Sequence, residues 1–147
     1  PLGGRGSELT VALPGGTYTL VDESYNANPV SMQAVIAALG ARPVIGRRIL
    51  ALTDMLELGA QGPALHAALA EDIRSAGVDR VFCAGPLMQA LWDALPPQTR
   101  GIHAPDASLL APELKEAVRP GDVVVVKGSN GSRASLIVDV LAGRGSS

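Results

Sequence analysis

Short apolar runs alternate along this chain with segments that have the spacing of an amphipathic helix, and this alternation limits the fold more than any other feature. The clearest runs are Arg48–Thr53 (RILALT), Arg80–Ala84 (RVFCA) and Asp122–Lys127 (DVVVVK), which are typical of buried strands. Helix-like segments separate the runs and are bounded by glycine or proline. The alternation predicts an α/β fold, a Rossmann-like three-layer domain with a mostly parallel sheet.

The beginning of the chain departs from this alternation. Leu9–Leu13 and Thr17–Val21 flank the turn signal Pro14-Gly15-Gly16, which predicts an antiparallel hairpin at an edge of the sheet. Farther along, 102–104 is expected to form a brief strand and 106–118 a helix. That helix should turn four apolar side chains inward: Leu109, Leu110, Leu114 and Val118.

Length and composition exclude several classes of protein. The 147 residues suffice for one domain with a substantial core. A net charge of -2 and 3% aromatic residues disfavour a basic nucleic-acid binder and a base-stacking surface. The single cysteine, Cys83, excludes an internal disulfide, and its apolar run predicts an inert core thiol. No segment reads as a membrane span or a signal peptide, so we expect a cytoplasmic protein, and the first residue, Pro1, suggests a fragment of a longer chain.

The stretch Val21–Met32 (VDESYNANPVSM) predicts a turn from a strand into a helix. Asn28 is expected to cap the helix and Pro29 to occupy its first position. Four more polar side chains then stand at the carboxyl end of the strand: Asp22, Glu23, Tyr25 and Asn26. In open α/β sheets ligands bind at this place, beside the positive end of the helix dipole. The alternative is a well-capped turn without a ligand.

A second polar loop, Thr53–Gly59 (TDMLELG), follows the next strand. Its acids Asp54 and Glu57, together with His66 in the helix that follows, could orient a polar substrate or assist a metal. Alternatively the acids are solvated, and a half-buried structural role is favoured for His66 because it flanks an apolar helix face. Two acids and one histidine do not make a metal site by spacing alone, so no metal site is predicted.

The third loop, Lys127–Arg133 (KGSNGSR), favours an anion. Lys127 ends a strand, small residues around Ser129 and Asn130 leave backbone N–H groups accessible, and Arg133 falls in the expected first turn of a helix. A cation there opposes the helix dipole and indicates an external phosphate or carboxylate. Neither a P-loop pattern nor G-x-G-x-x-G occurs in the chain, and a solvated glycine-rich turn is the alternative.

Parallel strands place the loops that follow them on one edge of the sheet. The loops after Val21, Thr53 and Val126 are therefore expected to converge on a shared rim.

Together these loops resemble the C-terminal domain of the Mur ligases. The resemblance is carried by Asp22–Met32, by Asp54–Gly59 with His66, and by Val126–Ser129, and it extends from about Gly4 to Leu141. The Y-N-A-N-P turn is typical of the branch that adds D-alanyl-D-alanine (D-Ala-D-Ala) to a UDP-muramoyl tripeptide. The family usually has glycine before the acid of the second loop, where this chain has Thr53.

The resemblance implies a three-domain, ATP-dependent ligase. Its N-terminal domain would hold the UDP-MurNAc-tripeptide, its central domain the P-loop and Mg²⁺, and its C-terminal domain, here the whole of 1–147, would close over ATP and D-Ala-D-Ala. ATP would phosphorylate the peptide carboxylate, and the dipeptide amine would displace the phosphate. This chain alone, without a P-loop, should carry no catalytic residue and should not catalyse.

The resemblance also implies which ligand each group of site residues would contact. The nucleotide would face Asp22, Glu23, Tyr25, Asn26 and Asn28. Lys127, Ser129, Asn130 and Arg133 would suit phosphate or the dipeptide carboxylate. Asp54, Glu57 and His66 are weaker substrate-binding candidates without a settled role.

Two other functions remain open. The chain could be the last domain of a sister ligase of the folylpolyglutamate synthetase type, which should lack the Y-N-A-N-P turn. It could also be a stand-alone small-molecule binding module, which tight nucleotide binding by the isolated chain would favour.

Overall fold

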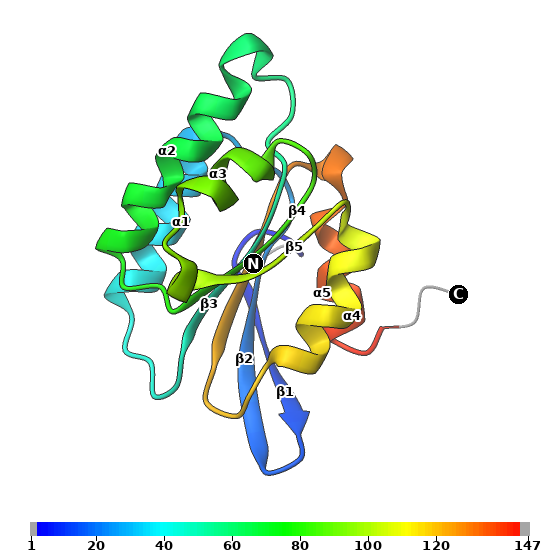
Figure 1. Ribbon diagram of the computed structural model, residues 1–147. Coiled ribbons are helices and arrows are strands. Elements are labelled where there is room, and N and C mark those ends of the chain that lie inside the picture. The colour runs from blue at the N-terminus through cyan, green and yellow to red at the C-terminus, as the bar shows by residue number, and fades with distance from the viewer. Residues whose placement is uncertain (1–2, 145–147) are drawn as a thin grey trace.

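A computed structural model describes residues 3–144, which form a six-stranded sheet between two layers of helices (Figure 1). The strand order is β1-β2-β6-β3-β4-β5. Neighbouring strands are parallel except for the first pair. The predicted Rossmann-like architecture, with an antiparallel hairpin at one edge, is confirmed.

The edge hairpin joins β1 (Ser7–Leu13) to β2 (Gly16–Glu23). Its strands pair from Ser7 opposite Asp22 to Leu13 opposite Gly16, and Gly15 in the turn has φ +89. A positive φ of this size favours glycine, so the turn signal read from the sequence has a direct backbone cause.

The four remaining strands complete the parallel part of the sheet, with β5 at its other edge. They are β3 (Arg48–Thr53), β4 (Arg80–Ala84), β5 (Arg100–Ala104) and β6 (Val123–Lys127). All five residues of β6 are buried, because it lies between β2 and β3 with helices over both faces. A continuous apolar run is what such a position requires.

The helices divide into two layers, which Figure 1 shows on opposite sides of the sheet. One layer holds α1 (Pro29–Ala41), α2 (Gly62–Ser75) and α3 (Met88–Ala94), and the other holds α4 (Ala107–Ala117) and α5 (Ala134–Leu141). Successive strand residues point to opposite faces, so the sheet contributes to two separate hydrophobic cores, one for each layer.

The route of the chain makes the neighbourhood of β6 special. The loops after β2 and β3 lead into α1 and α2 on one face, whereas the loop after β6 leads into α5 on the other. The connections therefore diverge on both sides of β6. In doubly wound sheets a crevice opens where neighbouring connections diverge in this way.

Three local expectations are wrong. Leu109 does not point inward, because α4 buries positions 107, 110, 111 and 114 and leaves Leu109 54% exposed. His66 is not half-buried but fully buried. Arg133 is not in the first turn of a helix: Asn130–Ser132 forms a short 3₁₀ turn, and Arg133 stands before α5 with φ 62 and ψ 39.

Among residues 3–144, no helix combines the length and the apolar character needed to cross a membrane.

Candidate functional site

The loops after β2, β6 and β3 lie on one rim, as predicted. The cause is the parallel register, in which Lys127 pairs with Glu23 on one side and with Leu52 on the other. The last residues of three adjacent strands thus stand side by side, and the polar loops begin there together.

The buried acid of the first loop, Asp22, stabilises the loop itself. Its carboxylate accepts hydrogen bonds from the backbone N–H groups of Gly4 and Ser24, both at 3.0 Å, and from the Ser24 hydroxyl. Asp22 is 7% exposed. These contacts assign it a structural role in the turn.

The next residues of the first loop are more accessible. Tyr25 is 55% exposed, and the guanidinium carbon of Arg5 lies 3.8 Å from the centre of its ring. The Asn26 side chain accepts a hydrogen bond from the N–H of Ala27 at 2.9 Å. One face of the tyrosine ring is thus occupied by a cation of the chain itself.

Asn28 caps α1 as predicted. Its side-chain oxygen accepts from the N–H of Ser31 at 2.8 Å, and the Ser31 hydroxyl accepts from the N–H of Asn28 at 3.0 Å. This reciprocal pair is a capping box with Pro29 at the first helical position.

Asp54 in the second loop caps α3 across a gap in sequence. Its carboxylate accepts from the N–H groups of Leu87 at 3.1 Å and Met88 at 2.9 Å, at the start of that helix. Burial raises the pKa of Asp54 above its usual value, and the two backbone donors oppose the rise. Gly85 allows this approach, because a Cβ there would lie 2.4 Å from the carboxylate.

His66 holds the second loop against α2. Its Nε2 accepts from the N–H of Met55 at 3.0 Å, and its Nδ1 lies 2.6 Å from the carbonyl oxygen of Gly62. Both ring nitrogens are engaged within the chain, which favours a structural role for His66. Glu57 is elsewhere in this loop, at φ 63, and lines a hollow described below.

Lys127 links the third loop to the first. Its Nζ donates to the carbonyl oxygen of Asn26 at 2.8 Å, and its side chain is buried at 5% exposure. Burial lowers the pKa of Lys127 and raises that of the neighbouring Glu23, while the attraction between the two charges opposes both shifts.

Hydroxyl groups fix the third loop to the second. The Ser129 hydroxyl oxygen accepts a hydrogen bond from the N–H of Leu56 at 2.9 Å. The Ser132 oxygen lies 2.8 Å from the carbonyl oxygen of Asp54 and 2.7 Å from the Thr53 hydroxyl. The Thr53 side chain therefore makes a contact that the glycine expected from the resemblance could not make.

Two hollows open on this rim. The cavity of about 480 Å³ between the three predicted loops is called the nucleoside hollow, after the ligand proposed for it below, and its lining is about equally polar and apolar. It is lined by Asn26, Ala27, Asn28, Leu56, Glu57, Leu58, Ser129, Asn130 and Gly131. Five of the predicted site residues thus meet in one cavity: Asn26, Asn28, Glu57, Ser129 and Asn130.

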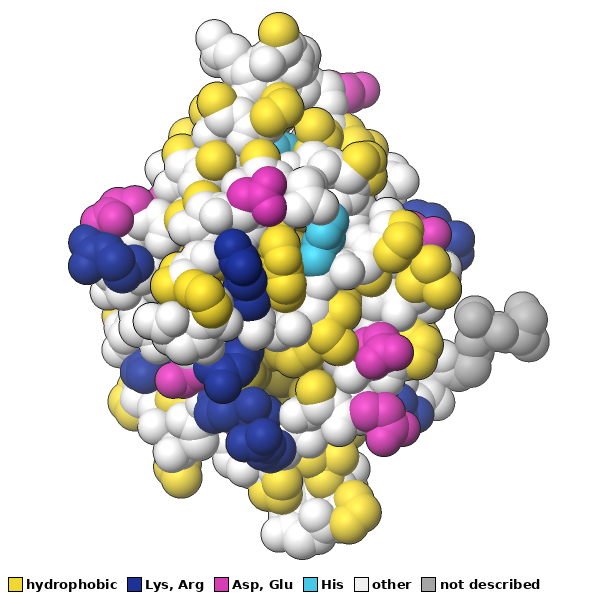
Figure 2. Space-filling model, viewed as in Figure 1, with side chains coloured by type: hydrophobic (Ala, Val, Ile, Leu, Met, Phe, Trp, Pro, Cys, Tyr) yellow, Lys and Arg dark blue, Asp and Glu magenta, His cyan; other side chains and the backbone are white. Residues whose placement is uncertain are grey.

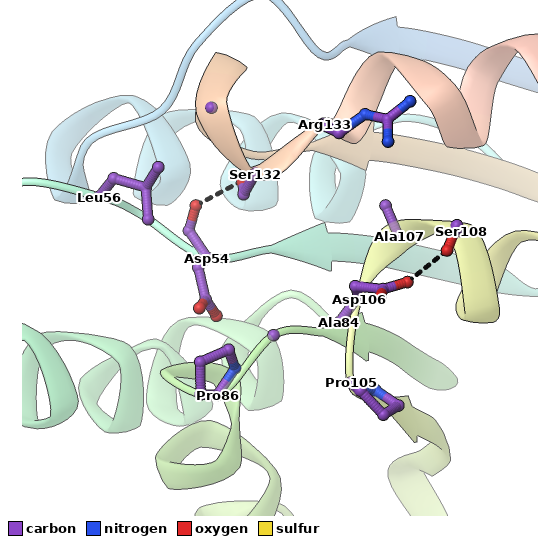
Figure 3. Close-up of a pocket in the computed structure, with 12 residues that line it drawn as sticks. Asp54, Leu56, Ala84, Pro86, Pro105, Asp106, Ala107, Ser108, Ser132 and Arg133 are labelled. Carbon is purple, nitrogen blue, oxygen red and sulfur yellow. Dashed lines mark hydrogen bonds between the residues drawn. The ribbon is translucent and has the colours of Figure 1, made fainter.

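The second cavity, of about 400 Å³, lies beyond Leu56 and Gly131, which border both cavities (Figure 3). It is called the dipeptide hollow, after the ligand proposed for it below. Its lining includes the predicted residues Asp54 and Arg133 and small apolar side chains from the loops after β4 and β5. Figure 3 shows Arg133 and Asp106 on the side of the cavity opposite Leu56 and Pro86.

The sequence interpretation missed Pro86, Pro105, Asp106 and Ser108 as lining residues of the dipeptide hollow. They follow β4 and β5, whose carboxyl ends lie at the same rim. The rule that gathered the first three loops would have found them if it had been applied to all five parallel strands.

The remaining predicted site residues line neither hollow: Asp22, Glu23, Tyr25, His66 and Lys127. In the described part of the chain no three metal-binding side chains lie close enough together to hold an ion.

A mostly parallel sheet with two cavities at the carboxyl ends of its strands defines a Rossmann-like ligand-binding domain. Residues 10–130 match the family described as Mur ligase, glutamate ligase domain, and the chain belongs to this family.

Individual relatives agree with this assignment. The chain is 36% identical over 128 residues to the UDP-N-acetylmuramoyl-tripeptide–D-alanyl-D-alanine ligase of Escherichia coli K12, covering 86% of this chain and 27% of that protein. The MurF ligase of Thermotoga maritima, solved in complex with ADP, superposes with a TM-score of 0.78 at 25% identity, over 98% of this chain and 31% of that one. The chain thus spans about a quarter to a third of these relatives' length.

A bifunctional folylpolyglutamate synthase/dihydrofolate synthase shares the fold as well. Its TM-score is 0.61 at 20% identity, over 95% of this chain and 32% of that one. The lower score and identity make the ligases that add D-alanyl-D-alanine the better match.

Proposed function

We propose that this chain is the closing domain of a ligase that adds D-Ala-D-Ala to UDP-MurNAc-tripeptide at the expense of ATP. The 36% identity to a relative of that name carries the proposal, together with the gathering of the loops that bear the family motifs. In this reaction ATP phosphorylates the tripeptide carboxylate to an acyl phosphate. The dipeptide amine then attacks the acyl carbon, the amide bond forms and inorganic phosphate leaves.

The nucleoside hollow fits the base and ribose of ATP better than its phosphates. Asn26, Asn28, Ser129 and Asn130 offer donors and acceptors for hydroxyl and ring nitrogen atoms. No lysine or arginine lines this cavity, and Glu57 adds a negative charge. We therefore assign the triphosphate and Mg²⁺ to the central domain of the parent enzyme and derive no step through them here.

The dipeptide hollow fits a small molecule with one carboxylate and short apolar side chains. Arg133 makes no ion pair with the described residues, so its guanidinium is available for a carboxylate. Asp106 accepts from Ser108 and the N–H of Leu109, and this lowers its pKa. Ala84, Pro86 and Ala107 give the walls the size and polarity that suit methyl groups.

The proposed role is positioning. A dipeptide held beside a nucleoside presents its amine to the acyl phosphate, and closure of the domain excludes the water that would hydrolyse that intermediate. These gains exist only against the partner domains. We expect the isolated chain to release no phosphate from ATP in the presence of both other substrates.

The test measures the KM for each substrate in variants of the full-length parent enzyme, so that the ligands of the two cavities can be distinguished. Arg133→Gln should raise the KM for D-Ala-D-Ala at least about tenfold with little change in the KM for ATP, because one charge-assisted contact is lost. Asn130→Ala should act mainly on the KM for ATP. Equal effects of both variants on both constants would contradict the assignment, and phosphate release by the isolated chain would contradict the proposed role.

A further inference from the structure

A third cavity, of about 370 Å³, lies at the opposite end of the sheet from the rim, where β4 and β5 begin. Four arginines line it, and we name it the arginine hollow: Arg47, Arg80, Arg100 and Arg119. Figure 2 shows several basic side chains in a row beside a depression floored by hydrophobic atoms. A strand of five residues is about 17 Å long, so this cavity is separate from the nucleoside and dipeptide hollows.

Most of the positive charge in the arginine hollow is not neutralised. Arg47 pairs with the buried Asp122 at 2.7 Å. Within residues 3–144, the other three arginines have no carboxylate within ion-pair distance, and Glu116 is the acid that lines the cavity. The whole chain has a net charge of -2, so this concentration of positive charge is local.

Two of the guanidinium groups are held in place by carbonyl oxygens. Arg80 donates to the carbonyl oxygens of Asp79 and Gln98. Arg100 donates from Nε to the carbonyl oxygen of Trp92 at 3.0 Å. A guanidinium has five N–H donors, so each retains donors for a ligand while its position is already fixed. Binding then costs little side-chain entropy.

The floor of the cavity depends on an irregularity in the sheet. The pairing of β4 with β5 shifts between Val81 and Cys83, opposite Gly101. A Cβ at Gly101 would lie 2.9 Å from the ring of Phe82, so glycine lets the two strands approach over that ring. Ile102 and Val118 extend the apolar floor beneath the arginines.

We propose that the arginine hollow binds a small, multiply charged oxyanion of the phosphate-ester or polyphosphate class. Planar guanidinium groups pair with phosphate oxygens through two parallel hydrogen bonds. Within residues 3–144, three of those in the arginine hollow form no ion pair, and Glu116 is outnumbered by the arginines around it. The apolar floor accommodates the organic part of an ester. The size of the cavity matches a small molecule. The site does not depend on the function proposed for the rim.

The experiment titrates the 147-residue chain with inorganic pyrophosphate by calorimetry at low salt. Saturable binding is expected, and the double variant Arg80→Gln/Arg100→Gln should weaken it at least about tenfold, because each arginine supplies charge-assisted hydrogen bonds. Affinity should also fall as salt rises. Arg74→Gln is the matched control, because Arg74 is an exposed arginine on α2 that pairs with Glu71.

Two further variants keep the outcome interpretable. The Arg119 side chain makes no hydrogen bond with the described residues, so Arg119→Gln should fold normally and still weaken binding severalfold. Arg133→Gln, on the rim, should leave binding unchanged. Absence of saturable binding would overturn the proposal, as would binding that Arg133→Gln abolishes and the arginine-hollow variants leave intact.

Discussion

Lys127 reaches from the end of β6 to the first loop and donates a hydrogen bond of 2.8 Å to the carbonyl oxygen of Asn26. This contact joins residues 101 positions apart and holds together two of the loops that line the nucleoside hollow. Because the ammonium is buried, its charge needs this acceptor and the nearby Glu23.

Replacing Lys127 should therefore destabilise the fold. Lys127→Met keeps the length of the side chain but leaves the Asn26 carbonyl without its donor and Glu23 without its neighbouring cation. We expect the free energy of unfolding to fall by about 2 kcal/mol, measured by urea denaturation. Lys115→Met on the exposed side of α4 is the control and should change it by less than about 0.5 kcal/mol. Equal effects would contradict the role of the contact.

The Thr53 side chain leaves no room for a Cβ at Gly128. A Cβ at Gly128 would lie 1.6 Å from the Thr53 hydroxyl oxygen and 2.9 Å from the Thr53 Cβ, whereas the Ala134 Cβ would be 3.2 Å away. Gly128→Ala should cost about 3 kcal/mol or more through overpacking. In a Thr53→Gly background, which removes the side chain that the new Cβ would meet, the same substitution should cost much less. A double-mutant cycle by urea denaturation measures the coupling, and additive costs would rule out the clash.

The cap of α1 provides a prediction about stability. Asn28→Ala removes the hydrogen bond to the N–H of Ser31 and should lower the free energy of unfolding by about 1 kcal/mol. Asn28→Ser should restore most of it, because a hydroxyl also caps. A serine variant as unstable as the alanine variant, by thermal denaturation, would show that the capping oxygen is not what Asn28 contributes.

Asp54 predicts a specific pH dependence. Burial raises its pKa above the ordinary value of 3.8, so the folded protein holds this proton more tightly than the unfolded chain. Its contribution to stability is present below pH 3.8 and is lost as the pH rises through the folded-state pKa. The stability of the wild type minus that of Asp54→Asn should therefore decrease with rising pH across this window. An increase, in denaturation curves at several pH values, would mean that the donors from Leu87 and Met88 outweigh burial.

The rim was predictable from the sequence because it follows from topology. Once β2, β3 and β6 are parallel, their carboxyl ends must lie together, and the polar residues after Val21, Thr53 and Val126 mark those ends. The hairpin and the cap at Asn28 were predictable for a different reason, since each depends on residues close in sequence.

Contacts between distant residues explain what the sequence did not reveal. Leu109 and Leu110 are equivalent in hydrophobicity, and only the packing of α4 against the sheet selects Leu110 for burial. The burial of His66 depends on the N–H of Met55, which the sequence pattern does not place. Arg133 was expected in a helix, but it has a positive φ and lies before α5. The preceding residue, Ser132, bonds to the second loop, and this contact between distant residues is not visible in the sequence.

The central claim is that the nucleoside hollow binds the base and ribose of ATP. Titration of the ¹⁵N-labelled chain with adenosine, which lacks the phosphates that the arginine hollow is proposed to bind, tests it most directly through backbone amide shifts. We expect weak binding, with dissociation constants on the order of millimolar, because adenosine carries no phosphates and the partner domain is absent. The amides of Asn26, Asn28, Glu57 and Ser129 should shift most. Micromolar binding, or shifts centred away from these residues, would contradict the account.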